Sequence, residues 1–441
     1  MSLDENQAIN DSQEADNGSP LTKMSLFLKR HGLLIALTGL FVINALDRQI
    51  LIILLEDIKQ EFSLSDSQLG ILSGFAFVAI YVLMGIPAAY LADHKSRKKL
   101  IAGALAVWSV MTVLCGAAQN YIQLLLARCG VGIGESACTP AAHSMIADTY
   151  APRHRTTALS VYGAGYFIGA FLGFTLGGWL AQQYGWRVAF YAVGAPGIIL
   201  SLLVWRFLKE PPRVGRPKDS TQLSLLQSIM ALMRIRSFRW YVIGGSIAVF
   251  GYAGLLTWLP AFMIREYGSS KVEIGGMLGA ITGLGGICGA IGFGIVTDKL
   301  ATKDRRWKLW IPIVIFAMSA PMVMVAFMVQ NMALTLLLCA IPIAVSSAFT
   351  APMISISQQI VPSNLHAMVT SIVFLFNNLI GFGFGPLATG MISDALTPEL
   401  GEAGALRQAL LYQSALFIVA AIMVFISIKH LPPNVNEGTG E

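Results

Sequence analysis

Long apolar stretches recur along the whole chain, with polar connections between them. Each stretch has about 20 residues, the length that an α-helix needs to cross a hydrocarbon core of about 30 Å. The pattern therefore predicts an all-α membrane protein with twelve transmembrane helices. Their expected ranges are 33–55, 67–91, 100–118, 121–147, 157–182, 187–208, 239–264, 273–297, 309–329, 332–360, 367–393 and 408–429.

The composition supports a membrane protein and excludes an ordinary soluble one. Of the 441 residues, 55% are hydrophobic and only 12% are charged, against about 25% charged in soluble domains. The first apolar stretch is too long for a cleavable signal peptide and follows an acidic tail, so we expect it to remain as a membrane helix. All five cysteines fall inside predicted helices, and their spacing matches no metal site.

The positive charges predict the orientation in the membrane. Most of the 30 Lys and Arg residues lie in loops that share one side if the amino terminus is cytoplasmic. By the positive-inside rule, both termini are then expected in the cytoplasm of a cell whose inner (plasma) membrane holds the protein. Because these charges sit in short loops beside helices, nucleic-acid binding is not expected.

One loop motif occurs twice and predicts two halves. Asp93 ends the second helix and is followed by a basic cluster that includes Arg97, and Asp298 precedes a similar cluster. Such a repeat is typical of transporters built from two six-helix halves. We interpret Asp93, Arg97, Asp148 and Asp298 as a cytoplasmic gate. The predicted parts are a disordered tail 1–24, an N-terminal half 25–208, a linker 209–238 with an amphipathic stretch, a C-terminal half 239–431 and a tail 432–441.

Charged side chains inside the first and fourth predicted helices mark the candidate site. Asp47 and Arg48 interrupt the first apolar stretch, and Arg128 and Glu135 lie on one face of the fourth helix. At 1.5 Å per residue, Asp47 and Arg128 share one depth, with Glu135 about 10 Å deeper. Ionisable residues in a membrane usually mark a transport or proton pathway. A permanent structural ion pair is the alternative, although buried pairs often add little net stability.

Neutral polar residues extend the candidate site. Tyr81, Tyr162, Tyr166, Asn377 and Asn378 are candidates for lining a cavity, although tyrosine in a membrane helix also packs or anchors at the interface.

A further titratable side chain and two glycine patterns also stand out. His143 could relay protons, or it could simply be a hydrogen-bonded packing residue. Glycine stripes run along the fifth and eleventh predicted helices, where they allow close helix contacts. We expect these stripes to form the seams on which the two halves rock.

Several of these motifs together resemble the major facilitator superfamily. The resemblance extends from about Ser25 to Leu431 and depends on Asp93 with Arg97, on the copy at Asp298, and on Arg128 through Gly134. It implies the fold of that superfamily, with twelve helices in two pseudo-repeated halves.

Within the superfamily the chain is similar to the Spinster group. The features that carry this resemblance are Asp47-Arg48 and the run Gly132-Ile-Gly134-Glu135 after Arg128. The resemblance implies export of sphingosine-1-phosphate in animals and transport of lysophospholipids in lysosomes. It also implies that Asp47, Arg48, Arg128 and Glu135 are functional residues. The chain departs from the usual pattern at Phe174, where antiporters often have proline.

These observations together predict a proton-coupled secondary active transporter that works by alternating access. Asp47 and Glu135 are expected to bind protons, and Arg48 and Arg128 to pair with them or with an anionic head group. The expected substrate is an amphiphilic lipid, either a lysophospholipid or a sphingoid phosphate. A carrier of small organic anions or drugs is the first alternative, and a channel or receptor is the second.

Enzymatic activity and bound groups are not expected. The sequence contains no HExxH, GxSxG, phosphate-loop or Cys/His motif. We expect no cofactor and no metal, protons as the coupling ion, the lipid bilayer and a small-molecule or lipid substrate as partners, and a monomer.

Overall fold

The structure is a computed structural model that describes residues 20–213, 225–361 and 366–431. Within these ranges the chain is helical and has no strand. The first helix of the described ranges begins at Pro20, so it includes residues 20–24. The predicted disordered tail 1–24 stays a prediction. Proline favours the first turn of a helix because its fixed φ suits that position. Residues 1–19 and the predicted tail 432–441 lie outside the described ranges.

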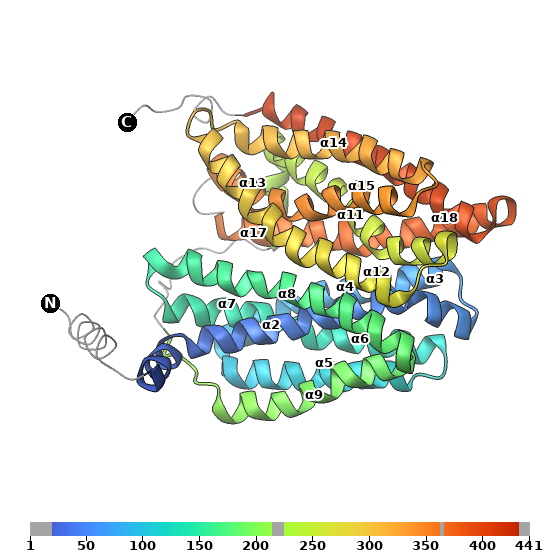
Figure 1. Ribbon diagram of the computed structural model, residues 1–441. Coiled ribbons are helices and arrows are strands. Elements are labelled where there is room, and N and C mark those ends of the chain that lie inside the picture. Colours follow the sequence, from blue (N-terminus) through green and yellow to red (C-terminus); the bar gives the residue numbers. More distant parts are fainter. Residues whose placement is uncertain (1–19, 214–224, 362–365, 432–441) are drawn as a thin grey trace.

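Two groups of helices lie side by side, one from each half of the sequence (Figure 1). The first group contains α2 (Pro20–Phe62), α3 (Asp66–Gly70), η1 (Ile71–Phe75), α4 (Ala76–His94), α5 (Arg97–Ala117), α6 (Tyr121–Glu135), α7 (Cys138–Thr149), α8 (Pro152–Tyr184) and α9 (Trp186–Phe207). The second contains α11 (Arg236–Tyr267), α12 (Lys271–Ala280), η2 (Ile281–Gly285), α13 (Gly286–Ala301), α14 (Trp307–Met328), α15 (Met332–Val345), η3 (Ser346–Phe349), α16 (Thr350–Ile360), α17 (His366–Phe376), η5 (Asn377–Gly383) and α18 (Phe384–Ile428).

The linker between the halves contains the short helix α10 (Leu225–Arg234). This helix falls on the amphipathic stretch predicted from the sequence, whereas residues 214–224 lie outside the described ranges.

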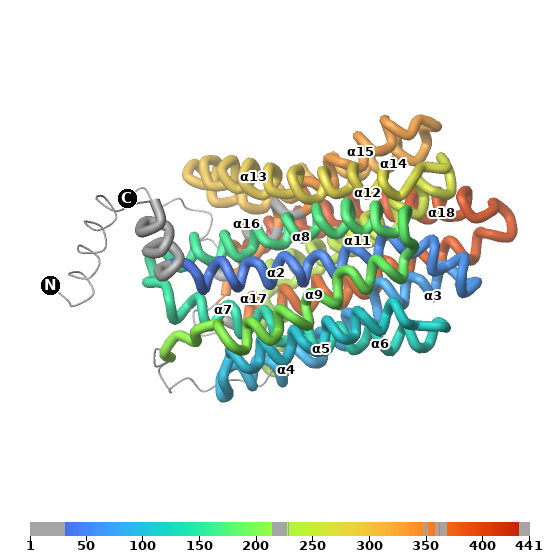
Figure 2. Tube along the Cα trace, turned by 60° about the horizontal axis from the view of Figure 1, so that its bottom comes forward, coloured from blue at the N-terminus to red at the C-terminus, as the bar shows by residue number. Residues whose placement is uncertain are grey.

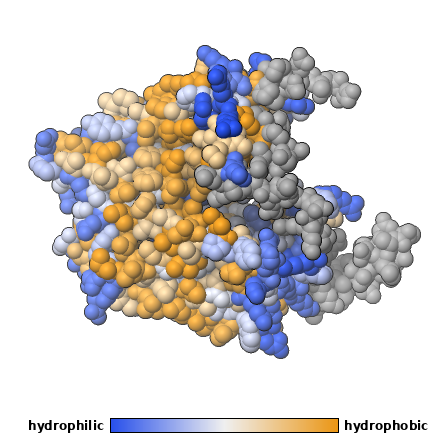
Figure 3. All heavy atoms as spheres, turned by 180° about the vertical axis from the view of Figure 1, so that it is seen from behind, coloured by the Kyte–Doolittle hydropathy of each residue, from blue (hydrophilic) through white to orange (hydrophobic). Residues whose placement is uncertain are grey.

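The surface of the bundle has an apolar band between two polar ends (Figure 3). Large apolar side chains such as Leu126, Ile199 and Leu337 are exposed on it. In water such a band would be costly, whereas in a bilayer it faces lipid tails. We call the end where α2 starts and α18 finishes the terminal face, and the opposite end, which carries α3, the distal face (Figures 1 and 2).

Nine helices in the described ranges are long and apolar enough to cross a membrane. The difference from the twelve predicted has identifiable causes. The predicted helices 121–147 and 332–360 are each broken into two shorter pieces. The last two predicted helices are joined in one assignment that turns sharply at Gly401, where φ is 69°. The chain therefore keeps the twelve-helix architecture in two halves.

The two broken helices share a local cause. Pro140 is the third residue of α7, and Pro352 is the third residue of α16. Proline has no N–H to donate to the carbonyl four residues earlier, so the helical hydrogen bonding is interrupted just before each proline. The break in the first half follows Glu135 directly, which places this carboxyl at a helix end inside the protein.

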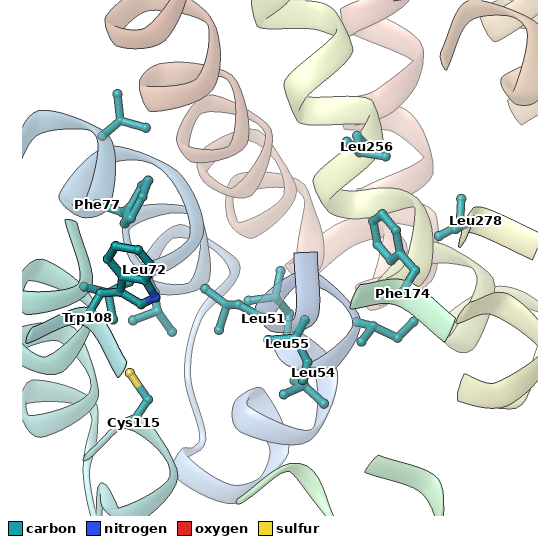
Figure 4. Packing of buried hydrophobic residues seen from close by; sticks show 14 of the residues in the cluster. Leu51, Leu54, Leu55, Leu72, Phe77, Trp108, Cys115, Phe174, Leu256 and Leu278 are labelled. Carbon is teal, nitrogen blue, oxygen red and sulfur yellow. The ribbon is translucent and has the colours of Figure 1, made fainter. Parts of the chain in front are cut away.

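Buried apolar side chains of the two halves belong to one cluster. Leu54 of α2 and Phe174 of α8 belong to the same buried cluster as Leu256 of α11 and Leu278 of α12 (Figure 4). A second cluster combines residues of the C-terminal half with Leu232 of the linker helix α10. The contact between halves is thus part of the main hydrophobic core.

Most of the glycine stripe in α8 lies inside its own half. Gly165, Gly169 and Gly173 approach backbone carbonyls of α2. In α18 the corresponding contact is that of Gly385 with the Phe250 carbonyl of α11. The expectation that these stripes are the seams between the halves is therefore wrong for most of their residues, because each stripe mainly joins two helices of one half.

Three glycines, two of them from the ends of these stripes, form close contacts between the halves. A Cβ atom at Gly275 of α12 would lie 2.4 Å from the Phe174 carbonyl oxygen of α8, and one at Gly178 would lie 2.3 Å from the Lys271 oxygen. A Cβ at Gly390 of α18 would lie 2.3 Å from the Asp66 oxygen. These helices approach at backbone distance, which only glycine permits.

The close contact at Gly275 predicts that substitutions at two neighbouring glycines differ in their effect on stability. Gly275→Ala should destabilise the purified protein by about 1–3 kcal/mol, because the added methyl group overpacks a backbone contact. Gly276→Ala is the matched control, since a Cβ there meets nothing within 4 Å. Thermal unfolding in detergent should show a lower midpoint for Gly275→Ala and no decrease for Gly276→Ala. Equal midpoints would contradict the close contact at Gly275.

Candidate functional site

Asp47 of α2 and Arg128 of α6 form an ion pair inside the N-terminal half. Arg128 Nη1 lies 3.7 Å from Asp47 Oδ1, and both side chains are buried. The Thr112 hydroxyl of α5 donates a hydrogen bond to Asp47 Oδ2. The contact agrees with the equal depth that the sequence predicts for Asp47 and Arg128.

Arg48 and Glu135 form a second pair beside the first. Arg48 Nε donates to Glu135 Oε2 at 2.6 Å. Since Asp47 pairs with Arg128, the pairing is crossed: α2 and α6 each supply one acid and one base, and each acid pairs with the base of the other helix.

The two arginines contact the same aromatic ring. The guanidinium carbon of Arg48 lies 5.0 Å from the centroid of the Phe77 ring, and that of Arg128 lies 5.2 Å from it. Arg48 also lies 4.7 Å from the centroid of Tyr81. Aromatic faces attract cations, so α4 stabilises both charges without adding a further acid.

The four charged residues differ in their access to solvent. Glu135 is fully buried and Arg128 and Asp47 are nearly so, whereas 27% of the Arg48 side chain is exposed. Arg48 is therefore the most accessible of the four charged side chains. Moving Arg48 toward a ligand would leave Glu135 without its partner.

Several buried polar atoms of the site have no hydrogen-bond partner among the described residues. They are Asp47 Oδ1, Arg128 Nε, Arg128 Nη1 and Glu135 Oε1. Buried polar atoms in folded proteins are almost always bonded, and exceptions often mark functional sites. The two ion pairs therefore leave part of the hydrogen-bonding capacity of these side chains unused among the described residues.

The predicted tyrosines lie around this cluster in different ways. Tyr81 covers Arg48, and Tyr166 accepts a hydrogen bond from Gln49 at 3.3 Å. Tyr162 is buried and stacks on Phe41 of α2, with ring centroids 4.6 Å apart. Tyr162 therefore packs within the half, while Tyr81 and Tyr166 are half-buried.

The predicted asparagines lie in the other half, in η5. Asn377 is buried and its side-chain oxygen accepts a hydrogen bond from Ser246 of α11. Asn378 donates to the Phe374 carbonyl. Both side chains are bonded within the C-terminal half, and their role in lining a cavity stays a prediction.

At the terminal face, Arg97 organises a cluster that does not join the halves. It forms ion pairs with Asp148 and with Glu210, and it donates to Ser144 Oγ at 3.1 Å. All of these partners belong to the first half or to the chain directly after it. Asp298 is exposed on α13 of the other half. The assignment of Asp93, Arg97, Asp148 and Asp298 to a cytoplasmic gate stays a prediction.

The cluster instead fastens the start of the linker. Glu210 accepts hydrogen bonds from Ser96 and from the amides of Arg97 and Lys98, so it caps the start of α5. Partial burial favours the protonated form of Glu210, but these hydrogen bonds hold its pKa below the ordinary value. Arg213 donates to backbone carbonyls at the end of α4 and completes the attachment.

Contacts that close the protein lie at the distal face. Arg265 of α11 makes two hydrogen bonds of 2.8 Å to the Asp66 carboxylate of α3 and one of 2.9 Å to Glu56 of α2. Lys59 lies 3.0 Å from Asp66. We call these residues, together with Asp394, the distal latch.

Asp394 of α18 joins the latch from the second half. Its carboxylate accepts hydrogen bonds of 2.8 Å from the amides of Asp66 and Ser67. These amides belong to the first turn of a helix and have no partner within it, so a carboxylate of the opposite half caps the start of α3. Separating the halves at this face would expose those amides and the Asp66–Arg265 pair.

The fold and the buried charges define the class of protein. Two six-helix halves around ionisable residues in the membrane are the architecture of secondary transporters. A model of the Major Facilitator Superfamily matches residues 37–386. The chain therefore belongs to the Major Facilitator Superfamily, and it is a multi-pass membrane transporter and not an enzyme.

Individual relatives refine the comparison. An MFS-type efflux pump of Mycolicibacterium smegmatis is 35% identical over 425 residues, which cover 96% of each chain. The sphingosine-1-phosphate transporter SPNS2 of Danio rerio is 26% identical over 377 residues, covering 80% of this chain and 74% of that protein. A crystal structure of a bacterial homolog of the human lysosomal transporter Spinster, inward-facing and unoccupied, matches with a TM-score of 0.82. It is 28% identical and covers 93% of this chain and 99% of its own. The predicted similarity to the Spinster group is confirmed.

The distal latch was not predicted from the sequence. Its residues lie at helix ends, where charged side chains are ordinarily exposed to water. The one available signal was the number of acids and bases at the outer ends of the helices: Glu56, Lys59, Asp66, Arg265 and Asp394. Their pairing depends on which helices of the two halves meet, and the spacing within one helix does not contain that information.

The latch predicts that Asp394 helps to hold the distal face closed. Asp394→Ala should shift the population toward a distal-open state, because two amides of α3 lose their acceptor. Spin labels on Gln119 and Leu400, one exposed residue in each half, would be measured in a variant without native cysteines. The label distance should lengthen in Asp394→Ala and stay unchanged in the control Glu399→Ala, an exposed acid on the same helix. An unchanged distance in both variants would refute the latch.

Proposed function

We propose that this chain is a proton-coupled secondary transporter of the inner membrane that moves an amphiphilic substrate with an anionic head group, of the lysophospholipid or sphingoid-phosphate kind. It works by alternating access, without a cofactor, and with both termini in the cytoplasm. Asp47 and Glu135 bind the coupling protons. Arg48 and Arg128 neutralise these acids or meet the substrate head group.

The crossed pairing of the four charged residues carries this proposal. Protonation of Glu135 removes the charge that holds Arg48, so the guanidinium becomes available to another anion. Deprotonation of Glu135 draws Arg48 back and weakens its hold on the substrate. The Asp47–Arg128 pair repeats this relation, and both of its side chains are buried.

The surroundings of Arg48 support an amphiphilic substrate. Arg48 is the partly exposed member of the cluster, and its guanidinium offers planar, paired donors that suit a phosphate group. The predicted helices of the opposite half carry no Asp, Glu, Lys or Arg in their apolar cores. A charged head on the first half and an apolar body against the second half fit this division. The likeness to a Spinster homolog and to a sphingosine-1-phosphate transporter supports the same class.

The closed distal face supports the orientation in the membrane. Ion pairs join the halves at that face, whereas the Arg97 cluster at the terminal face stays within one half. The Spinster homolog with the similar structure is described as inward-facing. With the terminal face in the cytoplasm, the present structure corresponds to the same arrangement.

A second candidate function is efflux of drug-like molecules or small organic anions. The observation that favours it is the efflux pump of Mycolicibacterium smegmatis, which matches over nearly its whole length. A panel of lysolipids, sphingoid phosphates, dicarboxylates and cationic dyes, tested for thermal stabilisation of the purified protein, separates the two candidates. Stabilisation by dyes or dicarboxylates alone would favour the second one.

Removing either acid should abolish coupling to a pH gradient. In proteoliposomes, uptake of oleoyl lysophosphatidate driven by a pH gradient should fall to the gradient-free rate in Asp47→Asn and Glu135→Gln. Exchange of substrate at equal pH should persist, because it needs no net proton movement. Ser319→Ala is the control, since this buried hydroxyl on α14 bonds only its own helix. The proposal fails if both acid variants respond to the gradient as the unmodified protein does.

Replacing Arg48 should weaken binding of the phosphate head selectively. The comparison is made with Glu135→Gln as the parent, so that no buried acid is left unpaired. Adding Arg48→Gln should weaken the binding free energy of oleoyl lysophosphatidate by about 1.5–3 kcal/mol, the range for a hydrogen bond to a charged group. This corresponds to a Kd roughly ten- to a hundredfold higher. Calorimetry with oleoyl lysophosphatidate measures this loss, and monoolein, which lacks the phosphate, is the control ligand. An equal loss for both ligands would exclude a specific role for Arg48.

A further inference from the structure

A cavity opens beside the candidate site, at the terminal face of the N-terminal half. It has a volume of about 370 Å³ and lies among the end of α4, α7 and the start of α8. Small side chains, including Ala89, Ala92 and Ala147, leave this space open. Polar groups on its wall are Asp93, His143 and Ser144. A cavity of this size with several polar groups can hold a chain of water molecules.

His143 lies between this cavity and the buried charges. Its side chain is exposed although it lies in the middle of α7, and it forms part of the cavity wall. On its other side the ring contacts Tyr162 edge-on, with centroids 5.4 Å apart. Tyr162 lies close enough to Arg48, Tyr81 and Cys138 for electrostatic interaction with them. His143 thus borders the cavity on one side and Tyr162 on the other.

Glu135 lies on the same path. It precedes His143 by eight residues, and the break between α6 and α7 falls directly after it. Its Oε1 atom is buried and has no hydrogen-bond partner among the described residues. Cys138, in the first turn of α7, is within electrostatic range of both Glu135 and Arg48.

We propose that this cavity is the proton pathway between Glu135 and the terminal face, with His143 as the relay at its inner end and Asp93 at its mouth. The inference rests on the proposed proton-coupled function. In the direction of release, the O–H bond of the Glu135 carboxyl breaks while a water-mediated N–H bond forms on the imidazole. The imidazolium then gives its second N–H proton to water in the cavity, which carries it past Asp93.

The side chain type and its neighbours suit such a relay. Histidine is the side chain whose ordinary pKa allows it to accept and release protons near neutral pH. The titratable or charged groups around it are Asp93 from α4, Arg97 from α5 through its hydrogen bond to Ser144, Tyr162 from α8, and Asp148 on α7 itself. Arg97 forms ion pairs with Asp148 and Glu210. These carboxylates neutralise its charge, which weakens its effect on His143.

Chemical rescue distinguishes a relay from a packing residue. His143→Ala should lower the proton-coupled uptake of oleoyl lysophosphatidate about tenfold or more, as expected when a positioned proton-transfer group is removed, and leave exchange at equal pH unchanged. Because the cavity is open, added imidazole should restore the coupled rate. Pyrrole has the same ring shape without a basic nitrogen and should restore nothing. His94→Ala, an exposed histidine at the same face, should behave as the unmodified protein.

Each other outcome overturns the relay. An unchanged coupled rate in His143→Ala, or an equal loss of exchange and coupling, or rescue by pyrrole as well as imidazole, assigns His143 to packing. A trapped pH-sensitive dye measures the proton flux directly in the same vesicles. If the unmodified protein itself shows no proton flux with substrate, the proposed function fails. If the unmodified protein shows proton flux with substrate and His143→Ala shows the same flux, the proposed function stands and only the pathway is wrong.

Discussion

The need to neutralise buried charge determines how the N-terminal half is built. Two acids and two bases lie in a membrane domain, where an isolated charge costs several kcal/mol. The protein meets this cost by pairing each acid with the base of the neighbouring helix and by placing Phe77 against both guanidiniums. The arrangement fixes α2, α4 and α6 relative to each other. It also means that each acid has one base as its charged partner.

The contacts between the halves are of a different kind. At the distal face they combine glycine contacts at backbone distance with ion pairs and a helix cap, and each requires exact placement. Such contacts form or break as a set, because a small displacement removes the close approach and the hydrogen bonds together. The terminal face has its strongest cluster within one half. The two ends of the molecule therefore differ in what holds them, although the halves repeat the same helical plan.

The sequence predicted the features that depend on one helix at a time. Helix number, the repeat of Asp93 at Asp298 and the equal depth of Asp47 and Arg128 follow from periodicity and rise per residue. The crossed pairing did not follow, because the spacing within each helix does not show how α2 and α6 meet. The breaks before Pro140 and Pro352 are predictable from the sequence, since proline interrupts helical hydrogen bonding. The attachment of Arg97 to Glu210 was not predicted, because Glu210 lies far along the chain. The role of the Arg97 cluster as a gate stays a prediction.

The balance of charge in the site bears on how voltage acts on the transporter. With both ion pairs formed, the two acids and two bases sum to zero. One bound proton makes the site positive by one unit, and a head group with a single negative charge restores neutrality. A proton and such a substrate that cross together would carry no net charge. The membrane potential, worth about 2.3 kcal/mol per charge at 100 mV, would then neither drive nor oppose the step, and the pH difference alone would set its direction.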